Sequence, residues 1–184
     1  MASVPVLTAV PTAYSGCCLA LTRSLVHYFN SLLPRPPSLA LSIGSGFGLL
    51  ETYLVTEPYT VHLIGVEVAP SPNSYLPADN HYAVHGSRFL CPLAADATAW
   101  LFVYPRRAGL VREYLAEYGD ASVNLILWAG PKADWDDYKS CFSGCWQVQV
   151  HNADEVGGSA WELIVVATKT RPLFPTSVEF SDVG

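Results

Sequence analysis

The residues with the clearest chemical meaning form a glycine-rich turn after a short apolar run. Directly after the strand-like segment 39–43 come Gly44, Ser45, Gly46, Phe47 and Gly48. A strand, a tight glycine turn and a helix N-terminus in this order make a cradle for an anionic or polar ligand. The glycines let the backbone approach the ligand, and the helix end presents free N–H groups. The turn therefore predicts a ligand-binding loop.

An acidic residue, Glu67, closes the next apolar run, 23 residues after Gly44. A carboxylate at this place can accept hydrogen bonds from both hydroxyls of a ribose. The dinucleotide fingerprint would need glycine at position 49, where this chain has Leu49, and the phosphate-binding motif of nucleoside triphosphatases is absent. The spacing G-x-G-x-G with Glu67 thus predicts a nucleoside site, and Leu49 counts against a nicotinamide-dependent reductase.

The elements that must position these residues alternate along the chain. Apolar runs predict strands at 39–43, 61–66, 82–85, 100–104 and 123–128, and two further β-like runs at 146–150 and 161–168. Helical spacing is found from Gly16 to residue 33, from residue 48 to 54 and from residue 110 to 118. This order predicts an α/β fold: a seven-stranded, mostly parallel sheet with helices on both faces and a C-terminal antiparallel hairpin.

We expect one domain over residues 1–184, because a chain of 184 residues has room for one. Within it, residues 1–15 form an N-terminal segment or lid, and residues 172–184 form an extended tail.

The glycine turn, the acidic end of the second strand, the Tyr104-Pro105 end of the fourth strand and the final hairpin together resemble the class I S-adenosylmethionine-dependent methyltransferases. The resemblance covers roughly residues 16–170 and implies the Rossmann-like fold of that superfamily, with S-adenosylmethionine as cofactor.

The resemblance also implies roles for individual residues. Contacts to the methionine part of the cofactor would come from Gly44, Ser45, Gly46 and Gly48, and contacts to the ribose from Glu67. Further predicted cofactor contacts are Phe47 by packing, Gly86 and Ser87 beside the adenine, and Tyr14 over the methionine carboxylate. The family commonly has an acidic residue where this chain has Ser42, and another in the loop that is here 86–88. Glu51 and Asp96 are the residues that could compensate.

The predicted catalytic residues are His85, Tyr104 and Arg106. His85 ends the third strand and could act as a general base, because its unperturbed pKa lies near neutrality. Tyr104 could orient a nucleophile, and Arg106 with Arg107 could clamp a carboxylate or phosphate of a substrate. The alternatives are a structural histidine and two arginines at a solvated helix start after Pro105.

The polar stretch after the fifth strand supplies further predicted substrate contacts. In this fold the carboxyl ends of the strands form the ligand crevice, which would place Asp134, Trp135 and Tyr138 at its rim. An ordinary helix start with acidic residues in its first turn explains the same stretch equally well.

The amino-acid composition limits the classes of molecule that the protein is expected to bind. Lys plus Arg is 10 against 16 Asp plus Glu, a net charge of -6 that argues against nucleic acid. The 14% of charged residues leaves apolar surface for a ligand or a second copy, so a homo-oligomer is a further expectation. The five cysteines are scattered and predict no metal site, and whether Cys141 and Cys145 pair stays open. No membrane span or signal peptide is predicted, which favours a cytoplasmic protein.

The function predicted from the sequence is methyl transfer from S-adenosylmethionine to a small molecule. The alternative is a protein of the same fold that does not methylate, such as an isomerase or cyclase or an accessory binding subunit.

Overall fold

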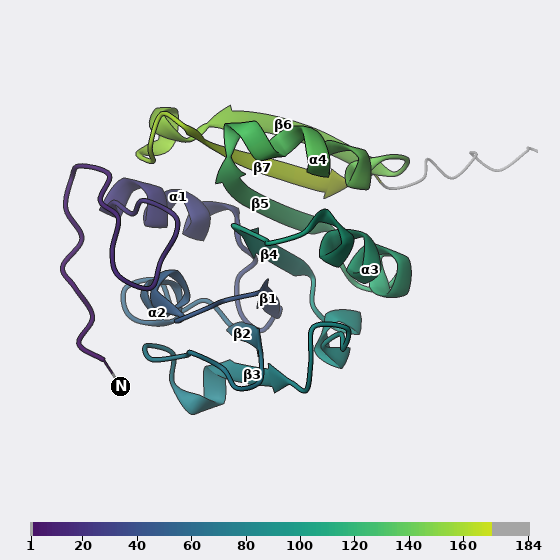
Figure 1. Ribbon diagram of the computed structural model, residues 1–184, viewed down its shortest axis with the longest axis horizontal. Coiled ribbons are helices and arrows are strands. Elements are labelled where there is room, and N and C mark those ends of the chain that lie inside the picture. Colours follow the sequence, from purple (N-terminus) through teal and green to yellow (C-terminus); the bar gives the residue numbers. More distant parts are fainter. Residues whose placement is uncertain (1, 171–184) are drawn as a thin grey trace, which may run out of the picture.

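The strands of the chain join in one seven-stranded sheet, as shown by a computed structural model that describes residues 2–170 (Figure 1). The strand order is β3-β2-β1-β4-β5-β7-β6. The strands are β1 (Ala40–Ile43), β2 (Leu63–Val68), β3 (His81–Val84), β4 (Ala99–Val103), β5 (Leu125–Pro131), β6 (Trp146–Asn152) and β7 (Glu162–Lys169). The α-helices are α1 (Arg23–Leu32), α2 (Leu49–Val55), α3 (Ala108–Tyr118) and α4 (Trp135–Tyr138).

The pairing directions confirm the predicted sheet. β1 to β5 pair in parallel, whereas β7 runs antiparallel to both β5 and β6. All five parallel strands therefore end at the same edge of the sheet. The chain proceeds from β1 outward through β2 to β3 and then returns to the other side of β1 with β4. This reversal is the topological switch point, where open α/β sheets bind their ligands.

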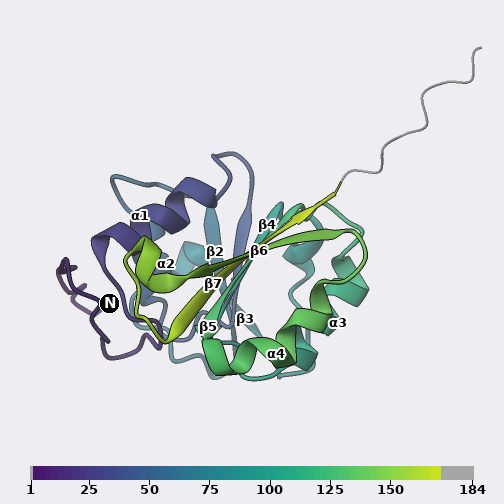
Figure 2. The same cartoon turned by 90° about the horizontal axis from the view of Figure 1, so that it is seen from above.

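Helices cover both faces of the sheet, as Figure 2 shows edge-on. Successive residues of β4 alternate between the faces: Ala99 and Leu101 pack with α1 and α2, whereas Trp100 and Phe102 pack with α3. Because both faces of the central strands β1, β4 and β5 are buried, these strands are apolar along most of their length.

The first helix begins later than the sequence predicted. Its N-terminus is Arg23, because the Thr22 hydroxyl accepts a hydrogen bond from the Leu25 N–H and so caps the helix. The expected helical residues from Gly16 to Leu21 instead form a turn and a bend, and Leu21 makes an isolated antiparallel bridge with Thr12. The expected tail from residue 172 lies outside the described residues. Within residues 2–170, every helix is too short or too polar to span a bilayer.

The α1 face should contribute strongly to stability. Phe29 is fully buried between α1 and the sheet, whereas Phe89 is 63% exposed. We expect Phe29→Ala to lower the free energy of unfolding by about 3–5 kcal/mol, because it leaves a cavity as well as losing apolar burial. Phe89→Ala should change it by no more than about 0.5 kcal/mol. Urea unfolding followed by tryptophan fluorescence measures both, and equal losses would contradict the packing described.

Candidate functional site

A cleft of about 960 Å³, here called the glycine cleft, lies at the carboxyl edge of the sheet over the switch point. Its lining includes the turn between β1 and α2, the end of β2 and the segment after β4. Gly44, Gly46 and Gly48 have φ of 83°, 58° and 79°. These left-handed conformations favour glycine. A Cβ at Gly44 or Gly46 would meet nothing within 4 Å, so the turn borders open space.

Glu67 ties the glycine turn to β2. One carboxylate oxygen accepts the Gly46 N–H at 2.8 Å, and the other accepts the Val68 N–H at 2.7 Å. The carboxylate is therefore fixed in position while it lines the glycine cleft. Each oxygen can still accept a further hydrogen bond, which is what the two hydroxyls of a ribose require.

A second carboxyl group lies at the floor of the glycine cleft. Glu51 in α2 is only 3% exposed and accepts a hydrogen bond of 2.5 Å from the Ser42 hydroxyl. Burial raises the pKa of Glu51 to about 7, the Ser42 hydrogen bond opposes this, and the charge of Glu67 adds to it. Ser42 and Glu51 thus place a carboxyl group below the turn although the strand itself carries none. Asp96 precedes β4, at the opposite edge of the sheet, and does not line the cleft.

The other wall of the glycine cleft includes Tyr104, which follows β4 with a φ of 49°. Its hydroxyl donates a hydrogen bond of 2.6 Å to the fully buried Glu162 of β7. Burial and this carboxylate both raise the pKa of Tyr104 well above its usual range. The hydroxyl therefore keeps its proton and acts as a donor. Glu162 also accepts the N–H groups of Ala20 and Ser159, each at 3.2 Å.

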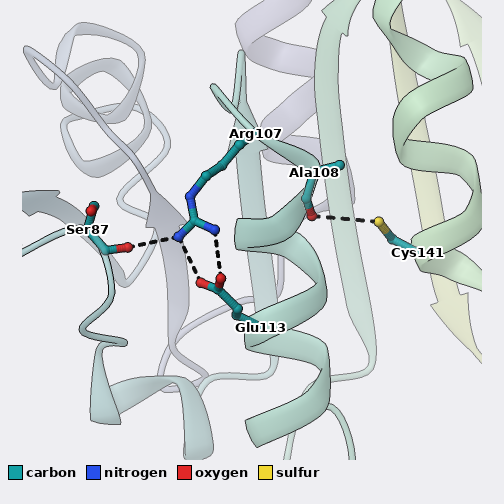
Figure 3. Close-up of polar contacts among 5 residues, drawn as sticks. All are labelled: Ser87, Arg107, Ala108, Glu113 and Cys141. Carbon is teal, nitrogen blue, oxygen red and sulfur yellow. Dashed lines mark hydrogen bonds and ion pairs between the residues drawn. The ribbon is translucent and has the colours of Figure 1, made fainter.

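Arg107 joins two loops beside the glycine cleft (Figure 3). Its guanidinium makes a bidentate ion pair with Glu113 of α3, at 2.7 and 2.8 Å, and donates to the Ser87 carbonyl at 2.8 Å. Figure 3 also shows the Cys141 thiol donating to the Ala108 carbonyl at 3.8 Å. The charge of Arg107 is thus already balanced, in contrast to the substrate clamp considered from the sequence.

A second cavity, of about 670 Å³, adjoins the first. Both cavities are bordered by Cys18 and by the segment 104–107, where they adjoin. On its far side the second cavity is lined by Pro131, Asp134, Asp137 and Tyr138, from β5 and α4. Of the predicted rim residues, Asp134 and Tyr138 therefore face this cavity, and Trp135 packs against Trp128 instead.

The structure brings together most of the residues singled out in the sequence. The glycine cleft is lined by Gly44, Ser45, Gly46, Phe47, Glu67, Ser87, Tyr104 and Arg106. Four others do not line it: Tyr14, Gly48, His85 and Gly86. Tyr14 donates its hydroxyl to the Val6 carbonyl, and His85 is exposed. Their functional roles stay predictions.

Some lining residues were not anticipated. Gly16, Cys17 and Cys18 form part of the wall, and Gly16 lies so close to Phe47 that a Cβ there would be 2.8 Å from the ring. Phe89 also lines the cleft. Neither segment has a motif, and only the two adjacent cysteines before a helix offered a signal. All five cysteines are free, Cys141 and Cys145 included.

Comparison with known proteins places this geometry in a recognised fold. No protein-family model and no curated protein matches the sequence. Among solved structures, the chain is similar to precorrin-6y C5,15-methyltransferase from Geobacter metallireducens, at 11% identity and TM-score 0.61 over 89% of this chain and 98% of that one. It is also similar to the small RNA methyltransferase HEN1, at 14% identity and TM-score 0.59 over 83% of this chain.

The chain spans only 26% of that second protein. A third similar structure is an uncharacterized protein from Listeria monocytogenes serotype 4b, at 15% identity and TM-score 0.55, covering 86% of this chain and 72% of that one. The chain therefore has the Rossmann-like fold of the class I methyltransferases, as the glycine turn and final hairpin predicted.

The three hydrogen bonds to Glu162 should stabilise the site measurably. Glu162→Gln replaces one acceptor oxygen by an NH₂ group that opposes a donor, so we expect a loss of about 2–4 kcal/mol in the free energy of unfolding. Tyr104→Phe removes a single donor and should cost about 1–2 kcal/mol. Exposed Glu117→Gln is the matched control. Urea denaturation tests the order, and a Glu162→Gln loss no larger than the control would refute it.

Burial of Glu51 predicts a pH-dependent stability. The carboxyl has an ordinary pKa of 4.5 when unfolded and about 7 when folded, so the folded state binds more protons between these values. The free energy of unfolding should therefore fall as pH rises from 4.5 to 7, by on the order of 3 kcal/mol, and level off above. Glu51→Gln should lack this fall. Denaturation of both proteins across this range measures the difference, and parallel profiles would contradict it.

Proposed function

We propose that this chain is an S-adenosylmethionine-dependent methyltransferase that acts on a small molecule. One observation carries the proposal. Two carboxyl groups, those of Glu67 and Glu51, line the cleft beside an open glycine turn at the switch point of a methyltransferase fold. A neighbouring cavity, which shares the lining residues 104–107 with the glycine cleft, provides room for an acceptor.

The residues of the glycine cleft fit this cofactor. Glu67 offers acceptors to the two ribose hydroxyls, and Glu51 offers a carboxyl group to the methionine ammonium. Ser45 has a buried hydroxyl oxygen without a partner among the described residues, at the point where the turn faces the cleft. The glycines leave the turn open to a ligand. The cleft thus has a matching group for the ribose hydroxyls and for the methionine ammonium.

S-adenosylmethionine supplies an electrophilic methyl group on a sulfonium centre. Its transfer is an in-line displacement that needs alignment and exclusion of water more than a particular catalytic side chain. In this chain, Tyr104 is held by Glu162 and so fixes the wall between the two cavities. We propose that Tyr104 and Arg106 position the acceptor at this wall. His85 lies outside both linings, and its role as a general base stays a prediction.

The second candidate is a protein of this fold that binds the cofactor or another metabolite without methylating. It is favoured by the loop 86–88, which presents no acidic side chain to an adenine amine. The buried Glu51 weakens it, because it supplies the carboxyl group that β1 itself lacks.

Calorimetric titration of S-adenosylmethionine separates these functions. We expect submillimolar binding to the wild-type chain and at least about tenfold weaker binding to Glu67→Ala, a loss of about 1.4 kcal/mol. Glu67→Gln, which keeps one acceptor, should fall between. Asp96→Ala, on the opposite edge of the sheet, is the control and should bind as the wild type does.

Absence of binding would refute the proposal, and NAD titrated in parallel would then test a reductase. An unchanged affinity in Glu67→Ala would show that the ribose lies elsewhere. Binding without methyl transfer to any of a panel of small amines, acids and phenols would favour the second candidate.

A further inference from the structure

The second cavity has an arrangement of charge that points to a class of ligand. Its volume of about 670 Å³ lies in the range of small-molecule sites. Arg106 and Arg107 line it from the segment between β4 and α3, and Arg112 lines it from α3 itself. Asp134 and Asp137 line it from the stretch around α4. The cavity therefore has a cationic wall and an acidic wall.

The two walls do not neutralise each other. Arg107 is paired with Glu113, which leaves Arg106 and Arg112 as the free cations of the first wall. Within residues 2–170, neither of these has a carboxylate within 4.0 Å, and Arg112 donates only to the Ser140 hydroxyl. Asp134 and Asp137 likewise have no cation within that distance in the described part of the chain, whereas their neighbour Asp136 pairs with Lys139.

Between the walls, the cavity is bordered by aromatic side chains. Trp128 is 1% exposed and lines the cavity, yet its indole N–H has no hydrogen-bond partner among the described residues. Trp128 and Tyr138 therefore give this part of the cavity an aromatic border. Tyr138 donates its hydroxyl to the Pro105 carbonyl and so joins the acidic wall to the segment 104–107.

We propose that the second cavity binds a small zwitterion with an apolar body, of the amino acid type. Its anionic group lies against Arg106 and Arg112, its cationic group against Asp134 and Asp137, and its apolar part over Trp128 and Tyr138. Binding of the zwitterion does not depend on the proposed function. A polyanion such as RNA fits less well, because the acidic wall and the net charge of -6 repel phosphates.

Two matched probe series test the charge pattern. The aromatic series is phenylalanine, phenethylamine and phenylpropionate, and the aliphatic series is leucine, isoamylamine and isocaproate. Each series keeps one body and carries both charges, the cation alone or the anion alone. The full-length chain is titrated with each probe by calorimetry, with and without S-adenosylhomocysteine. In at least one series we expect the zwitterion to bind roughly three- to fivefold tighter than either singly charged probe, as exposed ion pairs allow. The preference should shrink at high salt.

Variants assign the charges to the walls. Arg106→Gln should weaken binding of the zwitterion and the acid but not the amine, with Arg35→Gln as the control. Asp137→Asn should weaken binding of the zwitterion and the amine but not the acid. Asp136 lies on the same short helix but outside the cavity lining, so Asp136→Asn should leave the affinities for the zwitterion, the amine and the acid unchanged.

The outcomes separate this inference from the proposed function. Equal affinities within both series, no binding of any probe, or variants that act alike on acid and amine would overturn the zwitterion site. Zwitterion binding by a chain that does not bind S-adenosylhomocysteine would uphold the site and refute the methyltransferase. Binding of S-adenosylhomocysteine without a preference for the zwitterion would refute the zwitterion site and leave the proposed methyltransferase standing.

Discussion

The carboxylate of Glu162 holds together three segments that meet at the functional edge of the sheet. It is fully buried in β7 and accepts hydrogen bonds from the Ala20 N–H, the Ser159 N–H and the Tyr104 hydroxyl. A buried carboxylate is tolerated only when such donors compensate its lost hydration. The N-terminal segment, the turn before β7 and the end of β4 are therefore constrained to one arrangement. Tyr104, which Glu162 holds in place, lines both cavities.

The two cavities divide the chemistry between them. The glycine cleft collects backbone N–H groups and two carboxyl groups that differ in environment, since Glu67 is held by backbone donors and Glu51 is buried beneath the turn. The second cavity collects exposed charges of both signs over buried aromatic rings. Parallel strands that all end at one edge make this possible, because side chains far apart in sequence are delivered to neighbouring positions.

Much of the fold could be predicted because it depends on local pattern. Strands buried on both faces can be recognised in the sequence as apolar runs. The G-x-G-x-G spacing from Gly44 to Gly48 directly after such a run indicates a ligand-binding turn. The functional site could be predicted from the sequence only in part. Glu51 was one of two alternatives, and only the structure shows that Ser42 donates to it while Asp96 lies at the far edge. The pairing of Arg107 with Glu113 and of Tyr104 with Glu162 depends on tertiary contacts that leave no periodic signal.

The segment 104–107 is a shared wall, and that has a thermodynamic consequence. A ligand in one cavity that shifts Tyr104 or Arg106 alters the shape of the other, so occupancy of the two is energetically linked. Linkage is reciprocal: whatever factor the first ligand imposes on the affinity of the second, the second imposes on the first. Arg107 connects this segment to the loop at Ser87 through a hydrogen bond to the Ser87 carbonyl, and to α3 through its ion pair with Glu113.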